Sequence, residues 1–157
     1  MSSAMSPETL AAALEREHHE IDEGIEAFLE DPSRVDALTA AMAALRRHIY
    51  LEEAFLFPPL RDGGMVAPIF VMVREHGEIW DTMDALEAEL AADPAGAATS
   101  LAGRALLEQL ASHNAKEEPI VYPQADAVLS AQASAELQAF IADGRIPDGW
   151  VCAQAGG

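Results

Sequence analysis

The sequence predicts an all-α fold: an up-down-up-down antiparallel four-helix bundle, followed by a short C-terminal helix and an irregular tail. Three observations support this prediction. Ala and Leu are abundant while aromatic residues are few, with five Phe, two Trp and two Tyr, a mixture that favours helices over sheets. Apolar residues such as Ile21, Ile25 and Phe28 recur at the spacing of one buried helical stripe. Short breaks separate four long segments, and short links favour antiparallel neighbours.

Breaks in this pattern place the first two helices. Ser6-Pro7-Glu8 is expected to start the first helix, with Ser as the cap and Pro in the first turn, and this helix should run to about Glu30. Asp31-Pro32-Ser33 is expected to end it and to start a second helix. The second helix should reach the Phe57-Pro58-Pro59 segment, after which Asp62-Gly63-Gly64 forms the clearest loop.

Similar breaks at proline-containing segments predict the bounds of the later helices. A third helix should begin near Ala67-Pro68 and reach about Ala92. Asp93-Pro94 repeats the Asp-Pro start, and a fourth helix should run from there to about Glu118 or beyond. A shorter fifth helix is expected over about residues 131–142.

Length and composition indicate one domain. The 157 residues, half of them hydrophobic, are enough to bury a substantial core. We expect a single domain over residues 1–157, with the bundle at about 7–128 and a C-terminal extension at about 129–157. The part of the extension after Gly144 is rich in Gly and Pro and is expected to be irregular.

The strong negative charge limits the possible partners. The net charge is −18 at neutral pH, and such a surface repels nucleic acid and anionic membranes, so neither is an expected partner. The single cysteine, Cys152, cannot form a disulfide within the chain, which fits a reducing cytosol. Residues 1–10 lack the basic and apolar regions of a signal peptide, and no apolar run is long enough to span a membrane. We therefore expect a cytoplasmic protein that is a monomer or a weak homodimer.

The most informative feature is an internal two-fold repeat. The first and third predicted helices both contain Glu-His-x-x-Ile, at residues 17–21 and 75–79. The second and fourth both contain His-x-x-x-Glu-Glu followed, after three residues, by an aromatic residue and Pro, at residues 48–58 and 113–123. Four of the five histidines therefore occupy matched positions, which scattered surface histidines would not do twice.

The spacing within each motif suits a metal ion. Residues four apart on a helix lie about 40° apart around its axis and one turn above each other, so His48 and Glu52 can reach one point. His113 and Glu117 can do the same. Burying such a carboxylate alone would cost several kcal/mol, whereas a metal ion compensates the carboxylate and the imidazole together.

The repeat predicts two half-sites, each with two imidazole nitrogens and one carboxylate. The expected metal ligands are His18, His48 and Glu52 in the first half-site and His76, His113 and Glu117 in the second. Carboxylates from the second and fourth helices can bridge two metals at the bundle centre. This mixed set suits iron, manganese or zinc, and two bridged metals favour iron or manganese over a structural zinc. The Glu-x-x-His pair of ferritin-like sites occurs only at Glu15, which counts against that type of bundle.

These doubled motifs resemble those of the hemerythrin family in its bacterial HHE-domain form, over about residues 10–127. The resemblance implies a non-haem diiron centre, in which two carboxylates and an oxo or hydroxo group bridge two iron ions. Members of the family bind dioxygen, sense oxygen or iron, or react with peroxide or nitric oxide.

The resemblance leads to two functional interpretations. The first is a diiron oxidoreductase or scavenger that binds and reacts with hydrogen peroxide, nitric oxide or dioxygen, with no catalytic residues apart from the metal ligands. The alternative is an oxygen-binding or oxygen- or iron-sensing module without turnover. A metal-storage or structural bundle is a third interpretation, which the single small site disfavours.

The sequence departs from the oxygen-carrying members of that family at one position. Those members have a second histidine four residues after the third-helix ligand, where this chain has Trp80. Four histidines rather than five disfavour simple reversible oxygen carriage and leave one coordination position to be filled. Either water fills it, or one of four side chains does: Asp22, Tyr50, Glu53 or Glu118.

Helix geometry separates these four side chains. On ideal helices Glu53 and Glu118 lie about 140° from the histidines five residues before them, so we expect them to be hydrogen-bond partners of the ligands or surface groups. Tyr50 lies about 200° from the histidine two residues before it and should point away. Asp22 follows His18 by four residues and faces inward if that histidine does.

The remaining candidates have simpler interpretations. His19 has no counterpart in the repeat and is expected to face solvent. Trp80 is expected to pack over the site, and Phe57 and Tyr122 are expected to be core or capping aromatic residues. Cys152 lies in the tail and is expected to be inert.

Overall fold

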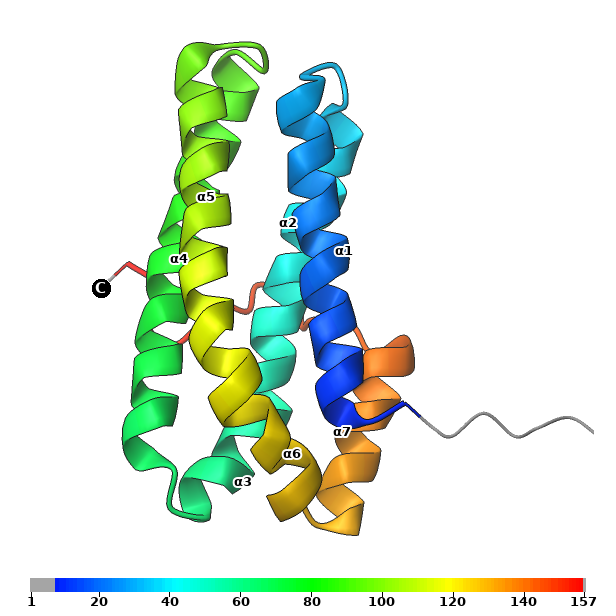
Figure 1. The fold of residues 1–157 in the computed structure, drawn as a ribbon. Helices are drawn as coiled ribbons and strands as arrows, with labels where there is room; N and C mark the ends of the chain where they lie inside the picture. The colour runs from blue at the N-terminus through cyan, green and yellow to red at the C-terminus, as the bar shows by residue number, and fades with distance from the viewer. Residues whose placement is uncertain (1–7, 157) are drawn as a thin grey trace, which may run out of the picture.

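The computed structural model describes residues 8–156, and all regular structure in this range is helical (Figure 1). The four long helices are α1 (Leu10–Glu30), α2 (Val35–Leu51), α4 (Val66–Ala92) and α5 (Ala97–Lys116). They lie side by side, with α1 packed against α2 and α5, and α4 packed against α5 and α2. Consecutive long helices run in opposite directions, so the predicted antiparallel bundle is confirmed.

The first helix begins later than the sequence pattern predicts. The predicted cap and first turn, Ser6-Pro7, lie outside the described residues, and Thr9 caps α1 instead. Its hydroxyl accepts a hydrogen bond from the backbone N–H of Ala12 at 3.0 Å. The carboxylate of Asp126 accepts two more, from the first two N–H groups of the helix, at 3.0 and 3.1 Å. This negative charge stabilises the N-terminus of α1.

The prediction that Asp-Pro segments start the second and fourth helices is wrong. Asp31 and Asp93 instead end α1 and α4, each with extended backbone angles and with its N–H bonded to the carbonyl four residues before. Helix α2 begins at Val35 and α5 at Ala97. The reason is steric, because proline disfavours helical backbone angles in the residue before it. An Asp-Pro pair therefore closed each helix rather than starting the next.

Helices α2 and α5 change type at their proline-containing ends instead of stopping there. The connected segments are the π-helix η1 (Glu52–Leu56) with α3 (Phe57–Asp62), and the π-helix η2 (Glu117–Val121) with α6 (Tyr122–Val128). The N–H of the aromatic residue after each π-helix, Phe57 or Tyr122, bonds to the carbonyl of the glutamate five residues back. The prolines that follow, Pro58 and Pro123, lack the N–H that a continuous α-helix would use. This wider turn brings each aromatic residue onto the face of its glutamate.

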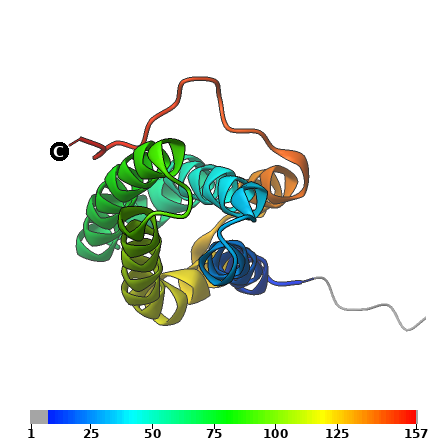
Figure 2. The same cartoon turned by 90° about the horizontal axis from the view of Figure 1, so that it is seen from above.

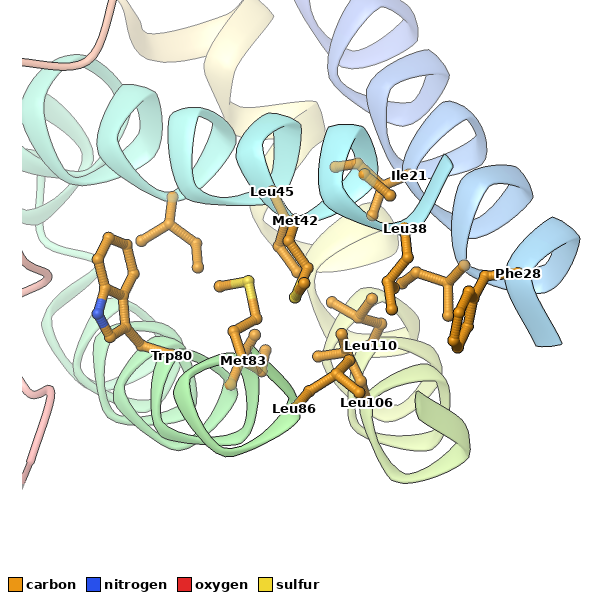
Figure 3. Close-up of a cluster of buried hydrophobic side chains, with 14 of the residues drawn as sticks. Ile21, Phe28, Leu38, Met42, Leu45, Trp80, Met83, Leu86, Leu106 and Leu110 are labelled. Atoms are coloured by element: carbon orange, nitrogen blue, oxygen red, sulfur yellow. The ribbon is translucent and has the colours of Figure 1, made fainter. Parts of the chain in front are cut away.

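The buried apolar side chains form two clusters, and a layer of polar side chains lies between them. The cluster towards the α1–α2 and α4–α5 loops includes Phe28 and Leu106 (Figure 3). The cluster towards α3 and α6 includes Leu56 and Ile69. The polar layer holds the histidines and glutamates of the repeat. In residues 8–156 no helix combines the length and the apolar character needed to cross a membrane.

The C-terminal part of the chain wraps the outside of the bundle. Helix α7 (Ala131–Asp143), the predicted fifth helix, packs along α1, α2 and η1. The irregular tail then passes outside α2 and reaches α4 (Figure 2). There the N–H of Ala153 donates to Oε1 of Glu53 at 3.1 Å. Cys152 is buried, with its Sγ 3.7 Å from the carbonyl oxygen of His76.

The tail approaches α4 this closely because position 77 is glycine. A Cβ atom at Gly77 would lie 2.5 Å from the carbonyl oxygen of Gln154, a backbone atom that cannot move without displacing the tail. The matched position in α1 is His19, which is exposed. This difference between the two repeats therefore marks the place where the tail packs.

Replacing Gly77 by alanine is expected to lower the free energy of unfolding by about 1–3 kcal/mol, the usual cost of overpacking. Urea unfolding followed by circular dichroism measures the change. In a chain that ends at Gly149, and so lacks Gln154, the same substitution should stabilise by about 1 kcal/mol, because alanine is the better helix former. A Gly77→Ala variant of the full chain that is more stable than the original would contradict the close packing.

Candidate metal centre

Six side chains of the repeat form the polar layer between the two apolar clusters. All six are buried, and the two carboxylates have no exposed surface. They are His18 from α1, His48 from α2, Glu52 from η1, His76 from α4, His113 from α5 and Glu117 from η2. The structure thus brings together, from six elements, all the side chains that the repeat predicts as ligands.

The ligand atoms of these side chains fall into two overlapping groups. His18, His48 and the two glutamates each offer one atom to the first group, and these atoms all lie within 4.8 Å of one another. His76, His113 and the same two glutamates form the second group under the same limit. The two groups therefore meet at the shared carboxylates.

Each shared glutamate presents one oxygen to each group. Oε2 of Glu52 lies 3.2 Å from Nε2 of His48, and its Oε1 lies 3.0 Å from Nε2 of His76. Glu117 repeats this arrangement, with its two oxygens 3.2 and 3.4 Å from the Nε2 atoms of the other two histidines. A carboxylate placed in this way can bridge two metal ions.

A second carboxylate holds each of the four histidines from behind, at Nδ1. The pairs are Glu17 with His48 at 2.7 Å, Glu53 with His76 at 2.8 Å, Glu75 with His113 at 2.9 Å and Glu118 with His18 at 2.7 Å. A carboxylate at Nδ1 fixes the orientation of the ring and leaves Nε2 as the atom that can bind a metal. All four Nε2 atoms accordingly face the bundle centre.

Sequence reasoning missed two of these partners, Glu17 and Glu75, although both stand in the repeated Glu-His-x-x-Ile motif. Neighbouring residues on an α-helix point about 100° apart, so neither glutamate can serve the histidine next to it. Each one reaches across to the histidine of the following long helix instead. The repeated glutamate was a signal for a partner on another helix.

The structure places the four side chains considered for the remaining coordination position in different surroundings. Glu53 and Glu118 lie behind the histidines, outside the two groups of ligand atoms. Tyr50 packs against Phe140 and other aromatic rings of the outer surface, away from the centre. Of the four, Asp22 lines the small cavity between the ligands.

Trp80, at the position that distinguishes this sequence from oxygen carriers, belongs to an apolar cluster (Figure 3). The guanidinium of Arg46 lies 5.1 Å from the centroid of its ring, and the ring of Trp150 in the tail lies 5.6 Å away. Trp80 therefore packs beside the tail rather than lining the central cavity.

Tyr122 belongs to the site, which corrects the expectation that it is only a core or capping residue. Its side chain is completely buried, and its hydroxyl oxygen lies 2.5 Å from Oε2 of Glu52 and 2.9 Å from Oε1 of Glu117. On a continuous α-helix Tyr122 would lie about 140° from Glu117 and point elsewhere. The π-helix η2 turns it inward, and the proline after it was the sequence signal for that change.

A comparison with known families agrees with this geometry. The model of the hemerythrin HHE cation-binding domain family matches residues 9–125. The chain belongs to this family. The match includes all six buried histidines and glutamates of the polar layer, and it makes the chain a hemerythrin-like cation-binding domain. No curated protein and no solved structure gives a match.

The residues of this hemerythrin domain fit a bound cation. Nε2 of His113 and Oε2 of Glu117 are buried, and neither has a hydrogen-bond partner within the part of the chain that the structure describes. A cation between them would supply that partner. The surrounding side chains leave a cavity of about 10 Å³, close to the room that a single water molecule or ion needs.

In the hemerythrin domain without metal, protons balance the buried negative charge. Burial alone would raise the pKa of Glu117, but the charge of His113 holds that pKa well below its ordinary range. Burial alone would lower the pKa of His113, but the charge of Glu117, 3.4 Å away, and the hydrogen bond to Glu75 raise it to about 10. A metal ion that binds these atoms must displace the protons.

We expect the metal-free protein to lose stability as the pH rises from about 6.5 to about 10. The pKa of His113 is raised from 6.5 to about 10 in the folded chain. Its charged form therefore stabilises the fold fully below pH 6.5, and this contribution disappears as the pH rises through the folded pKa. The melting temperature of chelator-treated protein, measured across this range, tests the expectation.

A matched pair of variants controls for other titrating groups. His113→Gln should make the pH profile less steep, with the remaining slope due to His48 and His76, whose pKa values are also raised. His19→Gln, at an exposed position, should leave the profile unchanged. A melting temperature that stays constant or increases over this pH range in the unaltered chain would contradict the raised pKa of His113.

Proposed function

We propose that this hemerythrin domain binds two iron ions at the polar layer. The ligands are His18 and His48 for one ion, His76 and His113 for the other, and Glu52 and Glu117 for both. The observation that carries the proposal is that the two groups of ligand atoms share both glutamates, each with one oxygen towards either side. A single metal ion would not need carboxylates arranged in this way.

The donor set supports iron over a structural zinc. It consists of imidazole nitrogens and carboxylate oxygens, a mixture that suits iron or manganese when two ions share bridges. Cys152 is the only cysteine of the chain, and its Sγ faces a backbone carbonyl rather than either group of ligand atoms. The thiolate ligands typical of structural zinc therefore play no part in the centre.

We further propose that the centre binds and reacts with small oxidants or gases, namely hydrogen peroxide, nitric oxide or dioxygen. Two bound iron ions would supply the electron transfer that such reactions require. The cavity between the ligands measures about 10 Å³ and has apolar walls that include Ile21, Leu45, Ile79 and Leu110. Walls of this kind exclude bulk water and limit the centre to very small molecules.

Asp22 provides this cavity with a group that can hold a proton. Its carboxyl group lines the cavity, and burial raises its pKa above the ordinary value against the opposing charge of His18. In its protonated form, a carboxyl group can donate a proton to an oxygen atom during peroxide cleavage. Its hydroxyl group would donate that proton from the cavity wall.

Oxygen binding without turnover is the alternative function. It would require the centre to hold dioxygen reversibly, which a fifth histidine assists in the oxygen carriers that the sequence resembles. At the corresponding position Trp80 packs against Arg46 and Trp150 and supplies no donor to the cavity. This observation favours reaction with the bound molecule over simple carriage.

Protein produced in iron-rich medium is expected to contain about two irons per chain by elemental analysis. Glu52→Ala and Glu117→Ala should each empty both positions, because each carboxylate faces both groups. His18→Ala should lose iron, whereas His19→Ala, the exposed neighbour, should keep two. One zinc per chain, or no metal at all, would contradict the proposal of a diiron centre.

The iron-loaded protein is expected to consume hydrogen peroxide and release oxygen, which an oxygen electrode records. Asp22→Asn should keep the iron and slow peroxide loss by on the order of tenfold to hundredfold, because the amide cannot give up a proton. His19→Ala should match the original rate. If the reduced protein instead forms a stable oxygenated species that reverses under vacuum, and peroxide is not consumed, the alternative function is correct.

A further inference from the structure

We propose that the phenol oxygen of Tyr122 is itself a metal ligand, on the ion held by His18 and His48, so that the two halves of the centre differ. This inference rests on the proposed function, because it requires metal at that half. It adds a ligand to the first half of the centre, and it locates the open coordination position in the second half, on the side of His76 and Trp80.

The position of Tyr122 in the fold directs it at the first half. The residue follows the π-helix η2, its side chain has no exposed surface, and its ring lies 5.3 Å from the ring of His18. The repeat places Phe57 at the matched position after η1. One half of the centre therefore receives a phenol and the other a benzene ring.

The contacts of the hydroxyl oxygen resemble the surroundings of a metal ligand more than those of a hydrogen-bonded phenol. The oxygen lies 2.8 Å from Nε2 of His18, 2.9 Å from Nε2 of His48, 2.5 Å from Oε2 of Glu52 and 2.9 Å from Oε1 of Glu117. These four residues are the complete first group of ligand atoms. A phenol has one proton to donate, so it can satisfy one of the two carboxylates as a donor and no more.

Metal binding would give a partner to the carboxylate and imidazole atoms that the single phenol proton cannot reach. The phenol releases its proton to solvent, an oxygen–metal bond forms in place of the O–H bond, and no electron is transferred. The phenolate then shares one cation with the two imidazoles and the two carboxylates, and every one of the five atoms has a partner. The phenolate also brings a negative charge to the first half, which a neutral histidine ligand would not do.

The second half has no equivalent donor. The ring of Phe57 stacks on the ring of His76, with centroids 5.3 Å apart and planes 23° from parallel, and it carries no oxygen. Two buried ligand atoms that lack hydrogen-bond partners within the described residues, Nε2 of His113 and Oε2 of Glu117, also lie on this side. The ion held by His76 and His113 therefore keeps the exchangeable position at which a small molecule binds.

Visible absorption and resonance Raman spectra of the oxidised, iron-loaded full chain test the assignment. A phenolate bound to ferric iron has a charge-transfer band in the visible region, and excitation in that band enhances the vibrations of the tyrosine ring. We expect this band in the unaltered protein and its loss in Tyr122→Phe. Tyr50→Phe is the matched control, because the chain has only these two tyrosines, and it should keep the band.

A second readout locates the open position. The reduced protein, titrated with nitric oxide and followed by electron paramagnetic resonance, should bind one molecule per chain, and Tyr122→Phe should bind two. Phe57→Tyr should have the reverse effect, with a stronger visible band and weaker binding of nitric oxide. Two molecules bound to the unaltered chain would overturn the proposed asymmetry.

The outcomes separate this inference from the proposed function. Iron bound without a tyrosinate band, or a band that survives Tyr122→Phe, overturns the ligand role of Tyr122 and leaves the diiron centre in place. No iron in any variant overturns the diiron centre itself. A single iron in the unaltered chain that becomes two in Tyr122→Phe would show that the phenol excludes metal, which overturns the ligand role.

The test holds even if Tyr122→Phe does not fold. In the Tyr50→Phe background Tyr122 is the only tyrosine, so ring-deuterated tyrosine labels it alone. The enhanced Raman vibrations should then shift to lower frequency. Enhanced vibrations that do not shift, or the absence of any, would overturn the assignment.

Discussion

Two carboxylates at the centre of the bundle, Glu52 and Glu117, impose the strongest constraint on this molecule. Neither has any exposed surface, and apolar clusters pack on both sides of the layer in which they lie. An uncompensated charge in such a place costs several kcal/mol. Without metal, protons on His48, His76 and His113, whose pKa values the nearby carboxylates raise, offset this cost. The outer carboxylates keep those imidazoles in position.

The repeat gives the two halves of the polar layer matching histidines and glutamates, but other residues around the two halves differ. The matched histidines and glutamates give both halves the same nitrogen and oxygen donors. At the position after each π-helix, however, one half has Tyr122 and the other has Phe57. In the long helices, exposed His19 corresponds to Gly77, over which the tail packs. Two halves with the same histidines and glutamates thus acquire different surroundings from a few substitutions.

Much of the fold and of the polar layer could be predicted from the sequence, because both depend on α-helical periodicity. His48 and Glu52 are four residues apart, and that spacing alone places them on one face. What escaped prediction lies where the periodicity changes or where contacts link distant segments. Tyr122 turns inward only because η2 is a π-helix, and Glu17 serves a histidine on another helix. Asp31 closes one helix instead of starting the next, because the proline after it dominates the local backbone.

The hydrogen bond between Ala153 and Glu53 has a consequence for the order in which the molecule is completed. Glu53 holds His76, and the backbone N–H that holds Glu53 comes from a residue 100 positions further along the chain. A ribosome delivers the chain from its N-terminus, and segments become available for packing in that order. The half of the centre that contains Tyr122 has all its side chains once α6 has emerged. In the other half, the backbone contact that holds Glu53 can form only after the tail has been synthesised.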